Sequence, residues 1–403
     1  MLLTRRVLLG TAFAGAAPRL HAQPAPVLFG ALYPFSGPLA LLGDESFRGL
    51  ELAVEERNGA GGLLGRPIKL LKGDAVDAAQ AVVEIKRLLG PERVAAVFGT
   101  YASPLAFAAS PVAELAGTPY FELGAVAEPL TERGFKYLFR SCATGAAVGT
   151  GTVNALADAL APLWGADART LRVAILHEDG LYGSTVSSVQ AARCTELELQ
   201  VVERISYSAS TTDLSSAVQR LREAGAEVVL HTAYGNDAVL FFRQMRQAGW
   251  LPRMVVGAGG GHSLQDTANT VGADYEGVVN VDFTQYAVNE RAAPGVRDVQ
   301  AAYEKRYGAK PRSGHSLANY MGARVFLDAV ARAGSLDRDK LRAAVLATDV
   351  ATGTTPTGWG VKFDERGQNT RAQTHLMQWQ GGQHTTVQPA DAAVGTLRPT
   401  LGS

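Results

Sequence analysis

The feature that most constrains the fold of this chain is a regular alternation of short β-rich runs with longer amphipathic segments, beginning near residue 26. Short apolar, β-branched runs predict strands, and apolar residues spaced three and four apart predict helices. Strand–helix–strand order requires a parallel sheet with helices on both of its faces. The sequence therefore predicts an α/β fold.

The alternation occurs in two series of similar size, which predict two doubly wound units. The predicted strands of the first series are 27–33, 68–72, 94–98, 119–123 and 138–142, and its helices are 44–58, 78–89 and 105–116. The predicted strands of the second series are 172–177, 199–206, 227–232, 254–257 and 277–282, and its helices are 182–193, 213–224 and 236–248. Long helices at 296–307 and 315–333 follow, then an expected hairpin of 361–363 with 374–380 and a loosely held polar tail from Gln383.

The N-terminal residues have the pattern of a secretory signal. Arg5 and Arg6 precede an apolar stretch, 7–17, that is too short to cross a bilayer, and small residues suitable for cleavage follow. We expect residues 1–23 to be a signal peptide. The arginine pair is similar to a twin-arginine signal, and the choice between the two export routes stays open. Because the first cysteine is Cys142, we expect a periplasmic protein without a lipid anchor.

Charge and cysteine content exclude several classes of function. The 38 basic and 38 acidic residues balance, which argues against an electrostatic nucleic-acid binder. Cys142 and Cys194 are too few for a disulfide scaffold or a thiolate zinc site, and whether they pair stays open. The segment 257–262 lacks dinucleotide-binding spacing because its sixth residue is His262. We expect no metal and no cofactor, and the sequence has no hydrolase or phosphate-binding motif that favours an enzyme.

Candidate binding residues follow the strands, because ligands of open α/β sheets bind at the carboxyl ends of the strands. Ser103 before Pro104 predicts a helix start with free N–H groups, which suits a carboxylate or is only a structural cap. Glu122 ends the next strand and receives a ligand ammonium or only solvent or an ion-pair partner. Tyr182 and Tyr234 follow strands of the second unit, where they contact a ligand or pack in their loops.

Several segments together carry a resemblance to a known family. They are Ser36-Gly37-Pro38, 49–67, 130–134, 139–140, 182–183, 211–214 and 242–244. With these segments the chain resembles the leucine/isoleucine/valine-binding family of type I periplasmic binding proteins, which serve ABC importers.

The resemblance implies two Rossmann-like lobes joined by three crossovers, near Ser141, Asp282 and Gly353, that close over a ligand. The expected parts are a signal peptide (1–23), lobe 1 (24–141 plus 283–353), lobe 2 (142–282 plus 354–390) and a flexible tail (391–403). It also implies a monomer that is not an enzyme, whose partners are a small-molecule ligand and an inner-membrane ABC permease. An exported sensor with the same fold stays an alternative.

The resemblance further implies which residues bind the ligand. The expected contacts are Tyr101, Ala102, Ser103, Gly124 and Val126 on lobe 1, and Tyr182, Tyr234 and Gly259 on lobe 2. Two of them depart from the amino-acid-binding pattern: Val126 replaces a common Thr, and Gly259 replaces a Glu that receives the ligand ammonium. Either Glu122 supplies that partner and the ligand is an amino acid of branched-chain type, or the ligand is another carboxylate or an amide.

Overall fold

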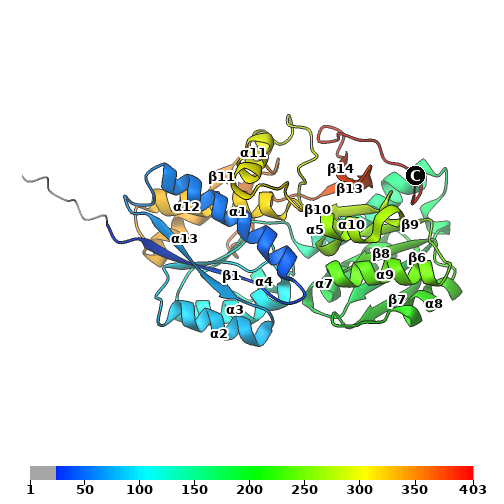
Figure 1. Ribbon diagram of the computed structural model, residues 1–403, viewed down its shortest axis with the longest axis horizontal. Coiled ribbons are helices and arrows are strands. Elements are labelled where there is room, and N and C mark those ends of the chain that lie inside the picture. Colours follow the sequence, from blue (N-terminus) through cyan, green and yellow to red (C-terminus); the bar gives the residue numbers. More distant parts are fainter. Residues whose placement is uncertain (1–23, 403) are drawn as a thin grey trace, which may run out of the picture.

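The structure, a computed structural model, describes residues 24–402, so the predicted signal peptide lies outside the described residues. Two lobes stand side by side, each built on one sheet (Figure 1). None of the helices within residues 24–402 has both the length and the apolar character needed to cross a bilayer. The predicted α/β fold with two lobes is confirmed.

The first lobe contains an all-parallel sheet in the order β2-β1-β3-β4-β5. Its strands are β1 (Val27–Tyr33), β2 (Ile68–Asp74), β3 (Ala96–Gly99), β4 (Tyr120–Glu122) and β5 (Leu138–Arg140). Its helices are α1 (Ala40–Gly59), α2 (Ala78–Leu89), α3 (Ser103–Ala116), α4 (Pro129–Glu132), α11 (Val296–Tyr307), α12 (His315–Ala333) and α13 (Arg338–Leu346). Helices α1 and α12 cover one face of the sheet, and α2 and α3 cover the other (Figure 1).

The second lobe contains a mixed sheet in the order β14-β13-β10-β9-β8-β6-β7. Its parallel strands are β6 (Arg172–Glu178), β7 (Gln200–Tyr207), β8 (Val228–Thr232), β9 (Met254–Gly257) and β10 (Val279–Asp282), and its antiparallel strands are β13 (His375–Gln380) and β14 (Gln383–Gln388). Its helices are α5 (Gly145–Asn154), α6 (Ala161–Leu163), α7 (Leu181–Glu196), α8 (Ser215–Glu223), α9 (Gly235–Gln247) and α10 (Gln265–Val271). A short two-stranded sheet pairs β11 (Asp349–Val350) with β12 (Val361–Lys362). In the sequence it follows α13 of the first lobe and precedes β13 of the second.

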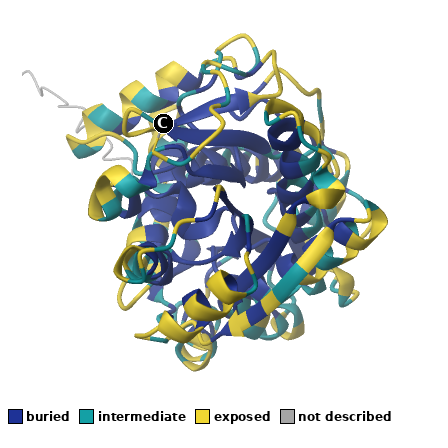
Figure 2. Ribbon diagram, turned by 90° about the vertical axis from the view of Figure 1, so that its right-hand side faces the viewer, coloured by how far each residue is buried: buried dark blue, intermediate teal, exposed yellow. Residues whose placement is uncertain are grey.

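Alternation along the strands divides the core of the second lobe into two layers. On β6, Val173 and Ile175 enter one hydrophobic cluster, and Ala174 and Leu176 enter another. Successive strand residues point to opposite faces, so the two clusters lie on opposite sides of the sheet. Figure 2 shows the consequence: buried strands lie inside, and exposed stretches gather on the outer faces of the helices.

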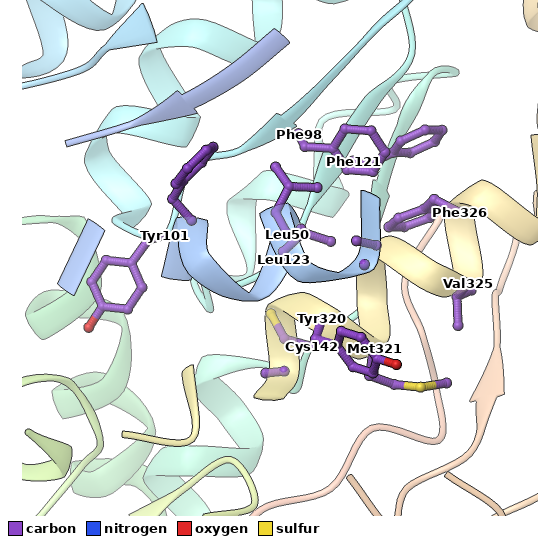
Figure 3. Close-up of a cluster of buried hydrophobic side chains, with 14 of the residues drawn as sticks. Leu50, Phe98, Tyr101, Phe121, Leu123, Cys142, Tyr320, Met321, Val325 and Phe326 are labelled. Carbon is purple, nitrogen blue, oxygen red and sulfur yellow. The ribbon is translucent and has the colours of Figure 1, made fainter. Parts of the chain in front are cut away.

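Stacked phenylalanines form the centre of the first lobe (Figure 3). The ring of Phe121 on β4 stacks on that of Phe326 on α12, with centroids 4.1 Å apart and planes 7° apart. Phe98 on β3 contacts both rings. Because α12 follows the parallel strands of the second lobe in sequence, this stack joins the two distant parts of the chain that make up the first lobe.

The structure differs from the predictions most clearly after residue 350. The expected hairpin of 361–363 with 374–380 is wrong: β12 pairs with β11, and β13 pairs with β10 and β14. The turn between β13 and β14 is Gly381-Gly382, whose positive φ values of 58° and 73° suit a two-residue hairpin. Residues 383–388, expected to belong to a loose tail, form β14 because the edge of β13 offers them a partner.

The third passage between the sheets also differs from expectation. Phe363 packs against Phe139 and Phe326 of the first lobe, so the chain crosses nearer to His375 than to Gly353. The segment 391–402 lies against the second lobe. There the Trp164 indole donates to the Pro399 carbonyl at 2.6 Å, and the Gly402 N–H donates to the Glu276 carbonyl at 2.7 Å. Cys142 and Cys194 are both buried and do not form a disulfide.

Substitution of Phe326 by alanine tests the contribution of the stacked core. We expect Phe326→Ala to lower the free energy of unfolding by about 3–5 kcal/mol, because the substitution removes a fully buried ring and leaves a cavity. Leu115, 90% exposed on α3, provides the control, and Leu115→Ala is expected to change stability by less than about 0.5 kcal/mol. Denaturant unfolding measures both; equal losses in the two variants would contradict this account.

Buried histidines gather in the second lobe. Nδ1 of His231 lies 3.1 Å from Nε2 of His262, and Nδ1 of His262 lies 2.8 Å from the Tyr275 hydroxyl. His384 stacks on Trp379 with ring centroids 4.7 Å apart. Burial lowers the pKa of His262 and of His384 to about 3, so both imidazoles are neutral at pH 7.

The low pKa of His384 predicts sensitivity to acid. In the unfolded chain His384 has a pKa of about 6.5, so the unfolded state binds a proton at a higher pH than the folded state does. The contribution of the neutral, buried imidazole to the unfolding free energy is complete above pH 6.5, and it is lost as the pH falls toward about 3. The variant His384→Phe keeps an aromatic ring on Trp379 but removes the titrating group. Between pH 7 and pH 5 we expect the wild type to lose about 2 kcal/mol more of its unfolding free energy than the variant. Identical pH dependence in denaturant titrations of the two proteins would refute the expectation.

Candidate functional site

The carboxyl ends of the parallel strands of both sheets face one narrow cavity, whose free volume in the closed structure is about 20 Å³. It is lined by Tyr101, Ser103, Gly124, Val126, Val148, Tyr182, Tyr234, Ala258, Gly259, Gly260, Asp282, Phe283 and His315. Both sheets therefore contribute to one site, as the strand-end rule predicts.

The two lobes are closed over this cavity. The Gly145 N–H donates to the Val126 carbonyl at 2.7 Å, and the Gln265 N–H donates to the Arg312 carbonyl at 2.9 Å. An ion pair of Arg312 with Asp266, 3.4 Å, also joins the lobes. In Figure 3 the ring of Tyr101 extends from the first-lobe cluster toward the ribbons of the second lobe. A molecule in the cavity would contact both lobes at once.

One wall of the cavity is suited to a negative charge. Helix α3 begins at Ser103, whose hydroxyl oxygen accepts the Ala127 N–H at 3.2 Å, which leaves the hydroxyl proton free to donate. The N–H groups of Ser103 and Val126 have no hydrogen-bond partner within residues 24–402. Unpaired N–H groups at a helix N-terminus, together with the helix dipole, attract anions.

Glu122 lies outside the cavity wall, beneath the two loops that form it. Its carboxylate accepts the N–H groups of Thr100 at 2.6 Å, Gly124 at 2.9 Å and Ala125 at 2.7 Å, and also those of Tyr101 and Leu123. Burial raises the pKa of Glu122 to about 7, and these N–H donors work against that rise. Glu122 therefore holds together the loops after β3 and β4.

The same contacts fix an unusual backbone conformation. Tyr101 has a φ of 75°, in the left-handed region that residues other than glycine seldom adopt. Such a conformation costs on the order of 1–3 kcal/mol and persists only where its surroundings impose it. Here the Glu122 carboxylate accepts the N–H groups of Thr100 and Tyr101 and helps to hold this conformation. As a result the Tyr101 ring projects into the cavity.

Two tyrosines of the second lobe form the opposite wall. Their ring centroids lie 5.3 Å apart, and the Tyr182 hydroxyl donates to the Ala258 carbonyl at 2.5 Å. The Tyr234 hydroxyl is buried and has no partner in the described part of the protein. Burial raises the pKa of Tyr234 well above its ordinary value, so the hydroxyl keeps its proton. An unpaired buried hydroxyl in a cavity wall is available to hydrogen-bond a ligand.

Asp282 at the end of β10 is an acidic cavity residue that the sequence analysis did not include among the binding residues. Its Oδ2 lies 3.1 Å from His315 Nε2 and accepts the Ser263 hydroxyl, and its Oδ1 accepts the Phe283 N–H at 2.7 Å. Burial raises the pKa of Asp282, but these three contacts outweigh it and hold the pKa below its ordinary value. The strand-end rule, applied to β10, could have found Asp282. His315 carries no such signal, because it begins a helix far along the chain.

The structure brings together most of the predicted binding residues. Those that lie in the cavity wall are Tyr101, Ser103, Gly124, Val126, Tyr182, Tyr234 and Gly259. Ala102 and Glu122 do not line it. The wall residues that the sequence analysis did not name as contacts are Val148, Ala258, Gly260, Asp282, Phe283 and His315.

Two lobes that close over a small cavity with aromatic walls define the class of proteins that trap a solute between domains. A family model described as "Periplasmic binding protein" matches residues 26–383. The chain is 48% identical over 386 residues to the Leu/Ile/Val-binding protein homolog 7 of Brucella suis biovar 1 (strain 1330), covering 96% of each chain.

Two solved structures show the same fold at low sequence identity. A leucine binding protein, LivK, from Thermotoga maritima MSB8 superposes with a TM-score of 0.79 at 23% identity, covering 89% of this chain and 97% of that one. A solute binding protein of an ABC transporter from R. palustris, in complex with benzoate, gives a TM-score of 0.78 at 22% identity, covering 94% and 99%.

The chain belongs to the periplasmic binding protein family. It is a periplasmic solute-binding protein of an ABC importer, related to the Leu/Ile/Val-binding proteins. Its relatives are binding proteins, not enzymes.

Replacement of Glu122 by glutamine tests its role beneath the loops. The amide of Glu122→Gln would point N–H donors at backbone N–H donors, so we expect the unfolding free energy to fall by about 1–3 kcal/mol. Denaturant unfolding measures this loss, and Glu223→Gln on the surface of α8 serves as the control. Unchanged stability in Glu122→Gln would show that the carboxylate does not hold the loops.

Proposed function

We propose that the cavity captures a small ligand bearing a carboxylate, either an amino acid of branched-chain type or a related acid. The observation that carries this proposal is the anion-binding wall at Ser103 and Val126, which is enclosed when the lobes are closed. A carboxylate would accept hydrogen bonds from the Ser103 hydroxyl and from the free N–H groups of Ser103, at the start of α3, and Val126, in the loop after β4. In a site without bulk water these hydrogen bonds to a charge are strong.

The remaining walls support a ligand with an apolar body. Val126, Val148 and Phe283 line the cavity, and Tyr101, Tyr182 and Tyr234 contribute ring faces. Burial of a branched aliphatic side chain against such walls contributes about 1.5–3 kcal/mol. The names of the Brucella relative, a Leu/Ile/Val-binding protein homolog, and of the Thermotoga leucine binding protein agree with a ligand of the leucine type.

A carboxylate without an amine is the second candidate. Gly259 and Val126 replace residues that the amino-acid-binding pattern carries, and the neighbour from R. palustris holds benzoate. An aromatic acid would use the same wall at Ser103 and would stack on the tyrosines. The two candidates therefore share the carboxylate and differ in the amine.

The proposed action is binding without catalysis. A ligand that contacts both lobes favours the closed state by the difference between its affinities for the closed and the open state. The closed protein then presents surfaces of both lobes to an inner-membrane permease. We further propose a monomer that does not bind nucleic acid and that residues 1–23 direct to export.

Substitution of Ser103 tests the carboxylate site. After a thermal-shift screen of amino acids and aromatic acids has identified a ligand, we expect Ser103→Ala to weaken its binding at least about tenfold. Binding is expected to weaken because the substitution removes the Ser103 hydroxyl, one of the hydrogen-bond donors proposed for the ligand's carboxylate. Calorimetric titration gives the affinity, and Ser188→Ala, on the exposed face of α7, is the matched control. Wild-type affinity in Ser103→Ala would remove Ser103 from the site.

A further inference from the structure

The geometry points to Asp282 as the residue that receives a positively charged nitrogen of the ligand. This inference rests on the proposed function and deepens it, because it selects an amino acid from the two candidate ligand classes. It also replaces the expectation that Glu122 supplies the missing carboxylate.

The absence of a side chain at residue 259 exposes the Asp282 carboxylate. A Cβ added to Gly259 would lie 3.0 Å from both Cγ and Oδ1 of Asp282, a contact tighter than nearly all real Cβ contacts. The Gly259 N–H donates to Oδ1 of Asn280 at 2.9 Å, which fixes this loop next to β10. A residue with a side chain at 259 would therefore displace the carboxylate. The negative charge at this corner of the cavity comes from β10 instead of from the loop after β9.

Asp282 retains capacity for one more donor on the side of the cavity. A carboxylate oxygen offers about two acceptor positions. Oδ2 accepts from Ser263 and contacts His315, so both of its positions are used. Oδ1 accepts only the Phe283 N–H. Both oxygens border the space beside Gly259, where an added Cβ would lie 3.0 Å from Oδ1 and 3.2 Å from Oδ2. An ammonium group placed there would complete the coordination of Oδ1.

The charges of the cavity wall favour a cationic group at this place. Asp282 is the carboxylate of the wall, and no lysine or arginine lines the cavity. His315, also in the wall, contacts Oδ2 at 3.1 Å, and no basic side chain contacts Oδ1. A cationic group of the ligand beside Oδ1 would therefore meet the carboxylate without competition from a basic side chain at that oxygen. Glu122, the other carboxylate near the cleft, is occupied by five backbone N–H groups. Asp282 is therefore the acidic group that a ligand can reach.

The proposed sites for the ligand's carboxylate and ammonium groups lie on different parts of the protein. The anion-binding wall at Ser103 belongs to the first lobe, and Asp282 ends β10 of the second sheet, beside the passage back to the first. A zwitterion satisfies both places only when the lobes are closed. The amine and the carboxylate would thus both contribute to the preference for the closed state.

Three probes separate the amine from the carboxylate. The first is the amino acid that gives the largest thermal shift with the wild type; the second is the same acid with hydrogen in place of the amine; the third is its carboxamide. By calorimetric titration of the wild type we expect the deaminated acid to bind at least about tenfold more weakly than the amino acid. The carboxamide is expected to lose at least about tenfold as well, through the wall at Ser103.

Asp282→Asn then assigns the amine preference to one residue. We expect this variant to lose at least about tenfold in affinity for the amino acid and to bind the deaminated acid within about threefold of the wild type. Asp158→Asn, an exposed site on the second lobe, is the control and should keep the wild-type preference.

The outcomes distinguish this inference from the proposed function. If the wild type binds the deaminated acid as tightly as the amino acid, the role of Asp282 is overturned and the carboxylate site stands. If the carboxamide binds as tightly as the amino acid while the deaminated acid does not, the carboxylate site is overturned and Asp282 stands. No binding of any probe overturns both. Because the wild-type comparison needs no substitution, it decides the inference even if Asp282→Asn fails to fold.

Discussion

The organisation of this protein depends on the way two parallel sheets face each other with their carboxyl edges. Each edge carries strand-to-helix loops whose N–H groups and side chains are not used by the sheets. When the lobes are closed, these loops form the walls of one cavity, with Ser103 and Tyr101 on one side and Tyr182 and Tyr234 on the other. Parallel pairing thus determines where polar groups remain unpaired and where a ligand can satisfy them.

Sequence patterns predicted best the elements whose hydrogen bonds join residues close together in the sequence, as in helices. The predicted bounds of α2, α11 and α12 match the structure because their apolar spacing and caps are encoded within each helix. The end of the chain was predicted less well. The partner of β13 was wrong because strand pairing is decided by distant segments, β10 and β14, and not by the strand itself. The strand-end rule located Ser103, Tyr182 and Tyr234 in the cavity wall, and the family resemblance added Tyr101, Gly124, Val126 and Gly259. Neither could show which way each carboxylate points.

Glu122 and Asp282 illustrate that last difference, because both are buried carboxylates at strand ends. Glu122 turns under its loops, where backbone N–H groups surround it and its pKa is raised to about 7. Asp282 faces the cavity, and its contacts with His315, Ser263 and the Phe283 N–H hold its pKa below the ordinary value. The residue type is similar, but one carboxylate builds the site and the other is exposed to whatever occupies it. Whether a ligand can reach Asp282 depends on the space beside Gly259, which is seen only in the three-dimensional structure.

The return of α12 to the first sheet has a consequence for the nascent chain. The strands that carry Phe98 and Phe121 are made early, but Phe326, which covers them, is added only after the whole parallel part of the second sheet. Until then α1 alone covers the face of the first sheet that it later shares with α12, and part of that apolar face is exposed to aggregation. The first lobe therefore completes its core only after the parallel strands of the second sheet have been synthesised.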